Sequence, residues 1–506
     1  MIVPEISPFF HSMVPKLRDW LMHLRRGEYA SLQTQIREAL VSAILDRNLD
    51  QAEPVPSTRK MAKSLGVSRN TVVLAYQGLL DDGYLVARER SGYFVSEKAL
   101  SENAPPTRRI STSPPQESAV DWRKRFKLHP ADAEFPSKPQ DWQKYPFPFI
   151  YGQVDHNLFP LAEWRECTRQ ALGKKWLGTW TNDSWSVDDP LLVEQVRRRI
   201  LPRRGIMASD DEILITLGAQ NALYLLTTLL VDKSTHVVME NPGYQDMRNA
   251  FELHAGQVSA VPVDEHGLTL AAELDTADLV FATPSHQYPT TVTMPLERRM
   301  ALLKKAREKD FLIIEDDYEF ETNYVNEPCP ALKSLDDDGR VIYVGSLSKT
   351  LFPGLRLGFM VGPKVLIAEA RALRRLMVRH PPNNNQRAAA LFLSLGHHDT
   401  LIRRLHKAYR TRWEVMGQAL NDHLPNASRS PSFGGTAYWV NGLASSDSEA
   451  LAVAALQKGI FIEPMRITFA GVNKPRNHFR LAFSSIDEAK IEPGIKLLAE
   501  TIRETR

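Results

Sequence analysis

The sequence predicts an α/β protein with two domains of different kinds: a small N-terminal domain of helices and a hairpin, and a larger C-terminal domain with a mostly parallel sheet. Its 506 residues are too many for one hydrophobic core. Near the N-terminus, apolar residues recur at helical spacing in successive stretches, which two short alternating runs follow. After residue 145, helical stretches alternate with short β-rich runs, a pattern typical of a largely parallel sheet.

Composition excludes several classes of protein. Hydrophobic residues make up 43% and charged residues 24% of the chain, and no apolar run approaches the roughly 20 residues of a membrane helix. The first residues lack a basic segment followed by an apolar one, so no secretory signal is expected. The only cysteines are Cys167 and Cys329, which argues against a disulfide framework and favours a reducing cytoplasm. Because the net charge is only +3, DNA binding has to be argued from local patterns.

The elements of the first domain follow in order along residues 27–98, after an expected extension over residues 1–26 with a short packing helix over 17–24. We expect helices over 31–45, 57–65 and 68–80, and strands over 84–87 and 93–95. Ser57 and Ser68 stand where N-caps start the second and third helices. Three helices followed by a hairpin describe a winged helix-turn-helix.

The third helix has the features of a DNA recognition helix. Its first turn carries small or polar residues that can reach base edges in the major groove: Ser68, Arg69, Asn70 and Thr71. Arg69 is expected to bind a guanine edge, and Asn70 an adenine or a phosphate. Further residues are expected to contact the backbone and set the register: Arg59, Lys63, Arg88, Arg90 and Gly92. Double-stranded promoter or operator DNA is therefore a predicted partner.

This domain resembles the GntR family of bacterial regulators. The matching stretches are Val55-Pro56-Ser57-Thr58-Arg59, the run from Leu65 to Thr71, Ala75-Tyr76, Leu79 and Gly83-Tyr84-Leu85. The wing differs slightly, because the usual Gly-Ser-Gly-Thr-Phe-Val reads Arg90-Ser91-Gly92-Tyr93-Phe94-Val95. The alternative is a helical module that only caps the larger domain. In such a module, the run Ser68-Arg69-Asn70-Thr71 at the start of the third helix would serve no purpose in packing.

Residues 99–145 are predicted to be a linker. Prolines stand there among Ser, Thr and charged residues with little periodicity. If flexible, a chain of about 45 residues spans on the order of 35–40 Å. The two domains are therefore expected to move relative to each other.

The larger domain, residues 146–506, places polar residues directly after its predicted strands. The β-rich runs are 213–216, 236–239, 279–282, 311–314 and 341–344. Asp316 and Tyr318 follow the fourth run, and Ser346, Ser348 and Lys349 follow the fifth. The run Gly218-Ala219-Gln220 opens a helix after the first, where free N–H groups and the helix dipole favour a phosphate.

The larger domain resembles the fold-type I, class I and II aminotransferases. The match is close across Glu315-Asp316-Asp317-Tyr318, the run from Gly345 to Lys349, and Pro353-Gly354-Leu355-Arg356-Leu357-Gly358. The resemblance implies pyridoxal 5'-phosphate, with Lys349 as the Schiff-base lysine and Asp316 against the pyridine nitrogen. The other expected cofactor contacts are Tyr318, Ser346, Ser348, Arg356, Gly218, Ala219 and Gln220, with Tyr244 over the ring face. Arg480 is the expected fork for an effector carboxylate.

One stretch departs from working aminotransferases. Pro284-Ser285-His286-Gln287-Tyr288-Pro289-Thr290 stands where they show Asn-Pro-Thr-Gly, so the asparagine that contacts the phenolate oxygen is missing and Thr291 replaces the glycine. This version resembles the MocR subfamily of GntR regulators, in which a winged helix is fused to such a domain. On that resemblance, His286 and Gln287 join the expected cofactor contacts.

The MocR resemblance implies a homodimeric regulator of the bacterial cytoplasm that associates with the nucleoid when bound to DNA. An amine or amino acid would form an external aldimine in place of Lys349 and shift the arrangement of the domains. The effector stays open among amino acids, ω-amino acids such as γ-aminobutyrate, taurine, diamino acids and the cofactor itself. Physiological turnover is not expected. The alternatives are a working pyridoxal phosphate-dependent aminotransferase that carries a DNA-binding domain, and a winged-helix regulator with an empty or repurposed pocket.

Other charged groups have plainer interpretations. Two arginine clusters are expected to be exposed helix faces: Arg197 to Arg199 with Arg203 and Arg204, and Arg371, Arg374, Arg375 and Arg379. His11, His23 and His254 stand without metal-ligand spacing, so no metal site is expected.

Overall fold

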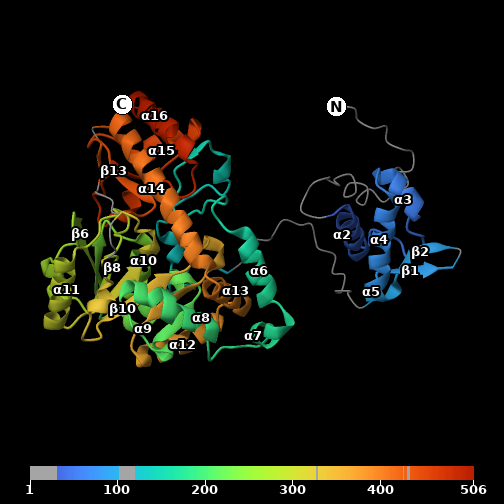
Figure 1. Cartoon of the computed structure of the whole chain (residues 1–506), viewed down its shortest axis with the longest axis horizontal. Helices are drawn as coiled ribbons and strands as arrows, with labels where there is room; N and C mark the ends of the chain where they lie inside the picture. The colour runs from blue at the N-terminus through green and yellow to red at the C-terminus, as the bar shows by residue number, and fades with distance from the viewer. Residues whose placement is uncertain are drawn as a thin grey trace. The chain divides into compact units, whose positions relative to one another are not determined.

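A computed structural model describes residues 31–89, 91–101, 120–325, 329–425, 427–429 and 434–505 (Figure 1). The chain forms two compact units, residues 1–122 and 123–506, and each is described by itself. The predicted extension over residues 1–26 and its helix over 17–24 lie outside the described residues.

The first unit is a winged helix-turn-helix. Its elements are α2 (Leu32–Leu45), α3 (Thr58–Leu65), α4 (Arg69–Asp81), β1 (Leu85–Arg88), β2 (Gly92–Val95) and α5 (Glu97–Ser101). The three helices and the antiparallel hairpin therefore appear where the apolar periodicity predicted them. Their shared core is apolar and buried, with Ile36, Leu40, Val72 and Leu79 fully inaccessible.

Serine side chains start the helices of this unit. The hydroxyl of Ser57 accepts a hydrogen bond from the Lys60 N–H, and that of Ser68 accepts one from the Thr71 N–H at 3.1 Å. These are the N-cap positions that the sequence indicated. Gly66, with φ of 63°, makes the left-handed turn between α3 and α4.

The second unit is built on an eight-stranded sheet of described residues. Its strands are β4 (Ile213–Thr216), β5 (His236–Asn241), β6 (Gln257–Asp264), β7 (Gly267–Leu268), β8 (Leu279–Ala282), β9 (Leu312–Asp317), β10 (Val341–Ser346) and β11 (Gly358–Val361). The order across the sheet is β4-β11-β10-β9-β8-β5-β6-β7. Neighbours from β10 to β6 are parallel, whereas β11 and β7 pair antiparallel. The predicted mostly parallel sheet is confirmed, and β9 and β10 extend far enough to include Asp316 and Ser346.

Both faces of this sheet are buried. On one face, Val237, Ile314 and Ile342 pack with residues of the helices α9 (Gly218–Leu230), α10 (Gln245–His254) and α12 (Lys364–Val378). On the other, Val238 and Ile313 pack with α11 (Leu296–Lys309), and a large cluster includes residues of α6 (Leu161–Ala171), α8 (Pro190–Gln195) and α13 (Asn383–Ser394). Successive strand residues point to opposite faces of the sheet. Because both faces are covered by other elements, each strand is a nearly continuous run of apolar residues in the sequence.

A smaller antiparallel sheet belongs to the same unit. Its order is β12 (Ser428–Arg429), β13 (Ala437–Asn441), β16 (His478–Ala482) and β15 (Glu463–Pro464). The helices α14 (His397–His423), α15 (Ser448–Gln457) and α16 (Glu488–Glu504) gather with β13 at the upper end of the unit in Figure 1. In the register of this sheet, Glu463 lies directly opposite Arg480.

The second half of the predicted linker, from residue 123 on, belongs to the second unit. Directly after the linker, strand β3 (Phe147–Pro148) pairs with β14 (Ile460–Phe461). Upstream of it, the Glu134 side chain forms ion pairs with Lys474 and Arg466 at 2.9 and 3.4 Å, and the Glu134 carbonyl accepts a hydrogen bond from Asn249 on α10. Residues 102–119 lie outside the described residues.

The expectation that both arginine clusters are exposed helix faces is wrong for two members. Arg374 is fully buried and forms an ion pair with Asp188 at 2.6 Å, while Arg204 is 3% exposed and pairs with Asp317 at 2.7 Å. A buried guanidinium requires a paired carboxylate. Helical periodicity alone does not reveal that partner, since it lies far away in the sequence.

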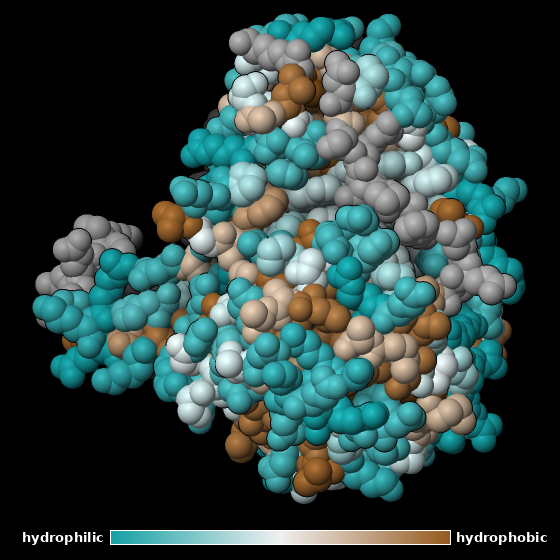
Figure 2. Space-filling view, turned by 90° about the vertical axis from the view of Figure 1, so that its left-hand side faces the viewer, coloured by the Kyte–Doolittle hydropathy of each residue, from teal (hydrophilic) through white to brown (hydrophobic). Residues whose placement is uncertain are grey.

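The face of the molecule shown in Figure 2 is mainly hydrophilic, with apolar side chains in small groups. Within the described part of the chain, no helix combines the length and the apolar character that crossing a membrane requires. No group of three or more His, Cys, Asp or Glu side chains among the described residues is arranged to hold a metal ion.

Candidate functional site

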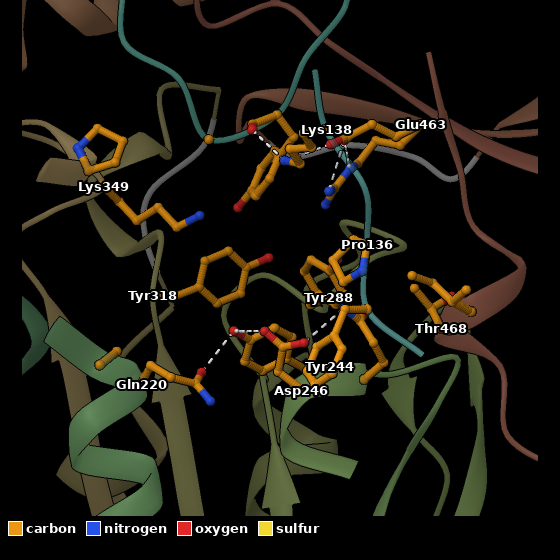
Figure 3. Close-up of a pocket in the computed structure, with 18 of the residues that line it drawn as sticks. Pro136, Lys138, Gln220, Tyr244, Asp246, Tyr288, Tyr318, Lys349, Glu463 and Thr468 are labelled. Carbon is orange, nitrogen blue, oxygen red and sulfur yellow. Dashed lines mark hydrogen bonds and ion pairs between the residues drawn. The ribbon is translucent and has the colours of Figure 1, made fainter. Parts of the chain in front are cut away.

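A cavity of about 510 Å³ lies between the carboxyl ends of the large sheet and the smaller sheet. Ligands of open α/β sheets bind at this edge. Figure 3 shows that side chains from distant segments converge on it. The lining residues used below are Lys138, Tyr151, Gly218, Ala219, Gln220, Tyr244, Asp246, Tyr288, Asp316, Tyr318, Ser346, Ser348, Lys349, Arg356, Glu463 and Arg480.

Lys349 reaches into this cavity from the turn after β10. Its Nζ lies 4.3 Å from the centroid of the Tyr151 ring and 5.8 Å from that of Tyr318. Burial lowers the pKa of the Lys349 amine to about 8, although the nearby Glu319 carboxylate opposes this shift. A substantial fraction of the amine is therefore neutral near pH 7–8 and able to act as a nucleophile.

Asp316 faces the same cavity from the end of β9. The side chain is 4% exposed, and its Oδ1 has no hydrogen-bond partner. Burial, reinforced by the neighbouring Asp317, raises the pKa of Asp316 to about 8. Because an unpartnered buried carboxylate oxygen is costly, Asp316 is suited to a protonated ring nitrogen, which would supply the missing donor.

Tyrosines wall the cavity between these two groups. The Tyr288 ring makes edge-on contacts with three others, those of Tyr244, Tyr318 and Tyr151, at centroid distances of 5.3, 6.3 and 6.5 Å. The Tyr244 hydroxyl donates to Gln220 Oε1 at 2.8 Å. Flat apolar faces with polar edges suit an aromatic ligand.

The far end of the cavity has the character of a phosphate cup. Gly218 has φ of 76° and opens α9, so the free N–H groups of the first turn point outward. A side chain at Gly218 would come within 3.2 Å of the Arg356 guanidinium. Arg356 itself donates to the Leu217 carbonyl at 3.2 Å, which holds its charge beside the start of the helix.

The two serines before Lys349 lie at this end of the cavity but differ in their contacts. Ser346 is 5% exposed at the end of β10. The Ser348 hydroxyl donates to the Leu357 carbonyl and accepts from the Leu357 N–H, both at 3.2 Å. Ser348 therefore also closes the loop that carries Lys349. An amine, an orphaned carboxylate oxygen, an aromatic wall and a phosphate cup together fit pyridoxal phosphate.

His286 and Gln287, two of the expected cofactor contacts, do not line the main cavity. The Gln287 amide is 1% exposed and donates to Glu240 Oε2 and to the Pro242 carbonyl. His286 Nε2 lies 3.4 Å from Glu319, beside a small neighbouring cavity. Tyr288, which directly precedes Pro289, does line the main cavity, where its ring can contact an aromatic ligand.

Arg480 has a partner that the sequence did not reveal. Its Nε and Nη2 both lie 3.0 Å from Glu463 Oε2, while Lys138 Nζ lies 2.6 Å from Glu463 Oε1. The Arg480 guanidinium also covers the Tyr151 ring at 3.8 Å. Sequence reasoning missed Lys138, Tyr151, Tyr288 and Glu463. For Tyr288 the sequence held a signal, because this tyrosine stands directly before Pro289, where the aminotransferases have the asparagine that contacts the cofactor.

The predicted DNA contacts lie on the surface of the first unit. Arg69 and Asn70 are exposed at the start of α4, and Arg59 and Lys63 are exposed on α3. Since Ser68 and Thr71 join their hydroxyls at 2.8 Å across the first turn, they cap the helix.

In the hairpin, Arg88 is exposed on β1 and covers the Phe94 ring at 4.3 Å. Gly92 has φ of 107°, which lets the turn close without strain. Arg90 lies outside the described residues.

Comparison with known proteins matches both units. Residues 187–498 match the family model of the class I and II aminotransferases, and residues 32–95 match that of the bacterial regulatory proteins of the gntR family. The chain is similar to the HTH-type transcriptional regulator TauR of Rhodobacter capsulatus, with 44% identity over 95% of this chain and 98% of that protein. It is also similar to the "Probable rhizopine catabolism regulatory protein MocR" of Rhizobium meliloti, with 29% identity over 94% of this chain and 95% of that protein.

Solved structures resemble the second unit. Kynurenine aminotransferase of Pyrococcus horikoshii has a TM-score of 0.70 and 29% identity, and the match covers 77% of this chain and 99% of that one. LysN, the α-aminoadipate aminotransferase of Thermus thermophilus, complexed with N-(5'-phosphopyridoxyl)-L-leucine, has a TM-score of 0.69 and 26% identity over 76% and 99%.

Proposed function

The chain belongs to the MocR-type regulators of the GntR family, and from this membership we propose that it adjusts its DNA binding in response to an amino acid or amine held at Lys349. It is a DNA-binding transcriptional regulator whose second unit is an aminotransferase-like domain that binds pyridoxal phosphate. We propose the chemical class of the effector, its binding at Lys349 and its influence on DNA binding.

One observation supports this proposal above the others. A half-buried amine, Lys349, and an unpartnered buried carboxylate oxygen, Asp316 Oδ1, face a single cavity, in a chain that also exposes Arg69 and Asn70 on a helix-turn-helix. Such perturbed and unpaired groups are costly for stability and typical of functional sites. A purely structural second unit would have no use for them.

In this proposal each end of the cavity has a separate task. Asp316 would hold the ring nitrogen protonated, and the start of α9 with Arg356 would hold the phosphate. Pyridoxal phosphate would supply, when bound, an aldehyde group that can be joined to one primary amine at a time. Lys349 would provide that amine at rest, and an effector amine that took its place would free the Lys349 side chain.

Release of Lys349 must favour one arrangement of the two units over another, because a ligand that binds both equally shifts nothing. A coupling of about 1–3 kcal/mol would change promoter occupancy about 5- to 150-fold. We also propose that the chain acts as a homodimer in the bacterial cytoplasm, since DNA sites of helix-turn-helix proteins are commonly read by two copies.

A second function keeps a specific observation in its favour. The cavity retains the lysine and carboxylate that a pyridoxal phosphate-dependent aminotransferase needs, and the fold matches such enzymes over 77% of the chain. The loss of the asparagine before Pro289 argues against efficient turnover. A test therefore has to follow both DNA binding and the release of a keto acid.

The test compares wild type with Lys349→Ala by fluorescence anisotropy on the DNA upstream of the gene, at fixed salt because phosphate contacts are salt-sensitive. Each protein is titrated with and without pyridoxal phosphate and a panel of amines. We expect the cofactor or one amine to shift the affinity or stoichiometry of wild type but not of the variant. Lys364→Ala, which removes an exposed lysine paired with Asp211, is the matched control. Equal DNA binding in every condition, together with keto acid formation, would instead establish the aminotransferase.

A further inference from the structure

Two cations share one carboxylate at the end of the cavity that lies away from Gln220 (Figure 3). Lys138 Nζ lies 2.6 Å from Glu463 Oε1, and Arg480 Nη2 lies 3.0 Å from Glu463 Oε2. Lys138 also donates to the Tyr151 carbonyl at 2.8 Å. All three charged side chains line the cavity.

The charges of this cluster do not balance. Two positive groups and one negative group leave a surplus of one positive charge, in surroundings where Glu463 and Arg480 are 5% and 3% exposed. Burial lowers the pKa of Lys138; Glu463 opposes the shift, and Arg480 adds to it. The Lys138 side chain is 32% exposed, so its charge is partly solvated, and the surplus positive charge at the cavity wall favours an anionic group there. The cofactor phosphate is not that group, because its cup lies at the Gly218 and Arg356 end.

The Tyr151 ring sets the distance from this cluster to the reactive amine. Lys349 Nζ lies 4.3 Å from the ring centroid, and the Arg480 guanidinium carbon lies 3.8 Å from the same point. Lys349 Nζ and the Arg480 guanidinium carbon are therefore no further apart than the sum of these two distances. A ligand whose amine replaces that of Lys349 reaches the cluster with an anionic group only a few carbons away.

Lys138 also belongs to the segment that leads from the DNA-binding unit. Phe135, Pro136 and Ser137 of this segment line the cavity together with Lys138. The Glu134 ion pairs with Lys474 and Arg466 hold its upstream end on the second unit. A firmer hold on Lys138 would therefore add to these anchors in restraining the segment on the second unit.

We propose that Lys138 is an effector-binding residue: together with Arg480 it binds the carboxylate or sulfonate of a short amino acid whose amine takes the place of the Lys349 amine. The added anion completes the charge of the cluster without requiring Glu463 to leave. It strengthens the hold of the cavity on the segment around Lys138, the part of the second unit that follows the DNA-binding unit in the chain. This inference rests on the proposed function, because it presupposes that an amine displaces Lys349.

Spectral titration of the cofactor-loaded full chain tests the binding step. The probes are n-propylamine, its carboxylate counterpart β-alanine and the sulfonate 2-aminoethanesulfonate, followed by the change in visible cofactor absorbance. We expect Lys138→Met to weaken the response to an anionic probe roughly tenfold or more, the size of one lost charge-assisted hydrogen bond, with the propylamine response unchanged. Lys138→Arg should restore part of the preference. Lys144→Met, which removes an exposed lysine paired with Asp141 on the same segment, should behave as wild type.

Hydrogen exchange of residues 123–138 tests the second step. Saturation with the better anionic probe should slow exchange there in wild type but not in Lys138→Met. Lys474→Met removes an anchor of Glu134 without changing the cavity charge, so it should keep the anionic preference and raise the exchange of the segment.

The outcomes separate this inference from the function it rests on. If no amine changes the wild-type absorbance, amine sensing fails and the role of Lys138 fails with it. If all three probes act on wild type and Lys138→Met affects them equally or not at all, sensing stands and the role of Lys138 is wrong. A preference for one anionic group over the other would identify the effector as a carboxylate or a sulfonate.

Discussion

The two units place their functional side chains in opposite environments. In the first unit, Arg69 and Asn70 stand exposed at the start of α4, on a helix whose buried face holds the core together. In the second, Asp316 is buried and Lys349 half-buried in one cavity, and desolvation moves the pKa of each to about 8. DNA is an external polyanion that exposed donors can meet, whereas the cofactor has to be held away from water for its ring and amine to be controlled.

This difference separates binding from stability in the two units. Removing an exposed DNA contact leaves the core of the first unit intact, so affinity should change while folding does not. Replacing a buried charged residue of the second unit changes its neighbours' electrostatics as well, so effects on ligand binding and on stability have to be measured side by side. The variants below test this contrast, from the largest expected effect to the smallest.

Lys349→Ala should have the largest effect, because it removes the only primary amine that we place at the cofactor. We expect complete loss of the covalent cofactor absorbance and of any amine response, while DNA affinity without effector stays within about twofold of wild type. Absorbance spectra and anisotropy on the same preparations measure both. A retained amine response in this variant would show that the effector acts elsewhere.

Asp316→Asn and Asp317→Asn compare adjacent carboxylates with different tasks. Asp316→Asn removes the carboxyl group that would be ionised against the cofactor's ring nitrogen, so cofactor affinity should fall roughly 10- to 100-fold, the value of one charge-assisted hydrogen bond. Asp317→Asn breaks the buried pair with Arg204 and should cost about 3–5 kcal/mol of unfolding free energy. Equilibrium dialysis with the cofactor and urea unfolding distinguish the two; equal behaviour would contradict the separate roles.

The pH dependence of stability sharpens the same comparison. Because the pKa of Asp316 is raised to about 8 in the folded chain and is near 4 when unfolded, the folded state retains a proton that the unfolded state loses between these values. Its contribution to stability therefore falls as pH rises from about 4 to 8. Without cofactor, Asp316→Asn should flatten this fall relative to wild type in urea unfolding across that range. Parallel wild-type and variant curves would mean that Asp316 ionises normally.

Arg69→Ala tests the exposed side of the comparison. We expect loss of about 1–3 kcal/mol of binding free energy on the specific DNA site, roughly 5- to 150-fold in Kd, with little change on unrelated DNA. Gln77→Ala, on the exposed C-terminal half of the same helix, is the matched control and should bind as wild type. If both DNAs are affected alike, Arg69 contacts phosphate and not a base.

Local patterns were sufficient for elements whose signal lies within a few residues. The helix starts at Ser57 and Ser68 and the strand from Ile213 to Thr216 appear where capping and apolar runs predicted them. Asp316 and Lys349, which the motifs singled out, likewise line one cavity. In each case, the physical cause is local: a capping hydroxyl, an apolar periodicity or a residue at the end of a strand.

Other parts of the site depend on pairing across long sequence distances. Glu463 meets Arg480 because β15 and β16 align them in register, and Lys138 joins them from more than 300 residues away. Nothing in the neighbourhood of Lys138 indicates such a partner. Gln287 shows the same dependence: it lies in a motif that resembles a cofactor contact, and its amide donates to Glu240 and to the Pro242 carbonyl, more than 40 residues earlier in the chain.

Ser68→Ala should have the smallest effect and isolates the contribution of one cap. It removes the acceptor for the Thr71 N–H at the start of α4, which should cost about 1 kcal/mol of unfolding free energy in the first unit. The donors at Arg69 and Asn70 stay on the helix, so DNA affinity should fall only as far as the first turn frays. Thermal unfolding of the DNA-binding unit, followed by a probe specific to it, measures the cap, and Ser64→Ala on α3, whose hydroxyl donates to the Lys60 carbonyl without capping, is the control. A loss of affinity as large as that of Arg69→Ala with unchanged stability would mean that the Ser68 hydroxyl contacts DNA directly, and the exposed surface of α4 would then begin one residue earlier.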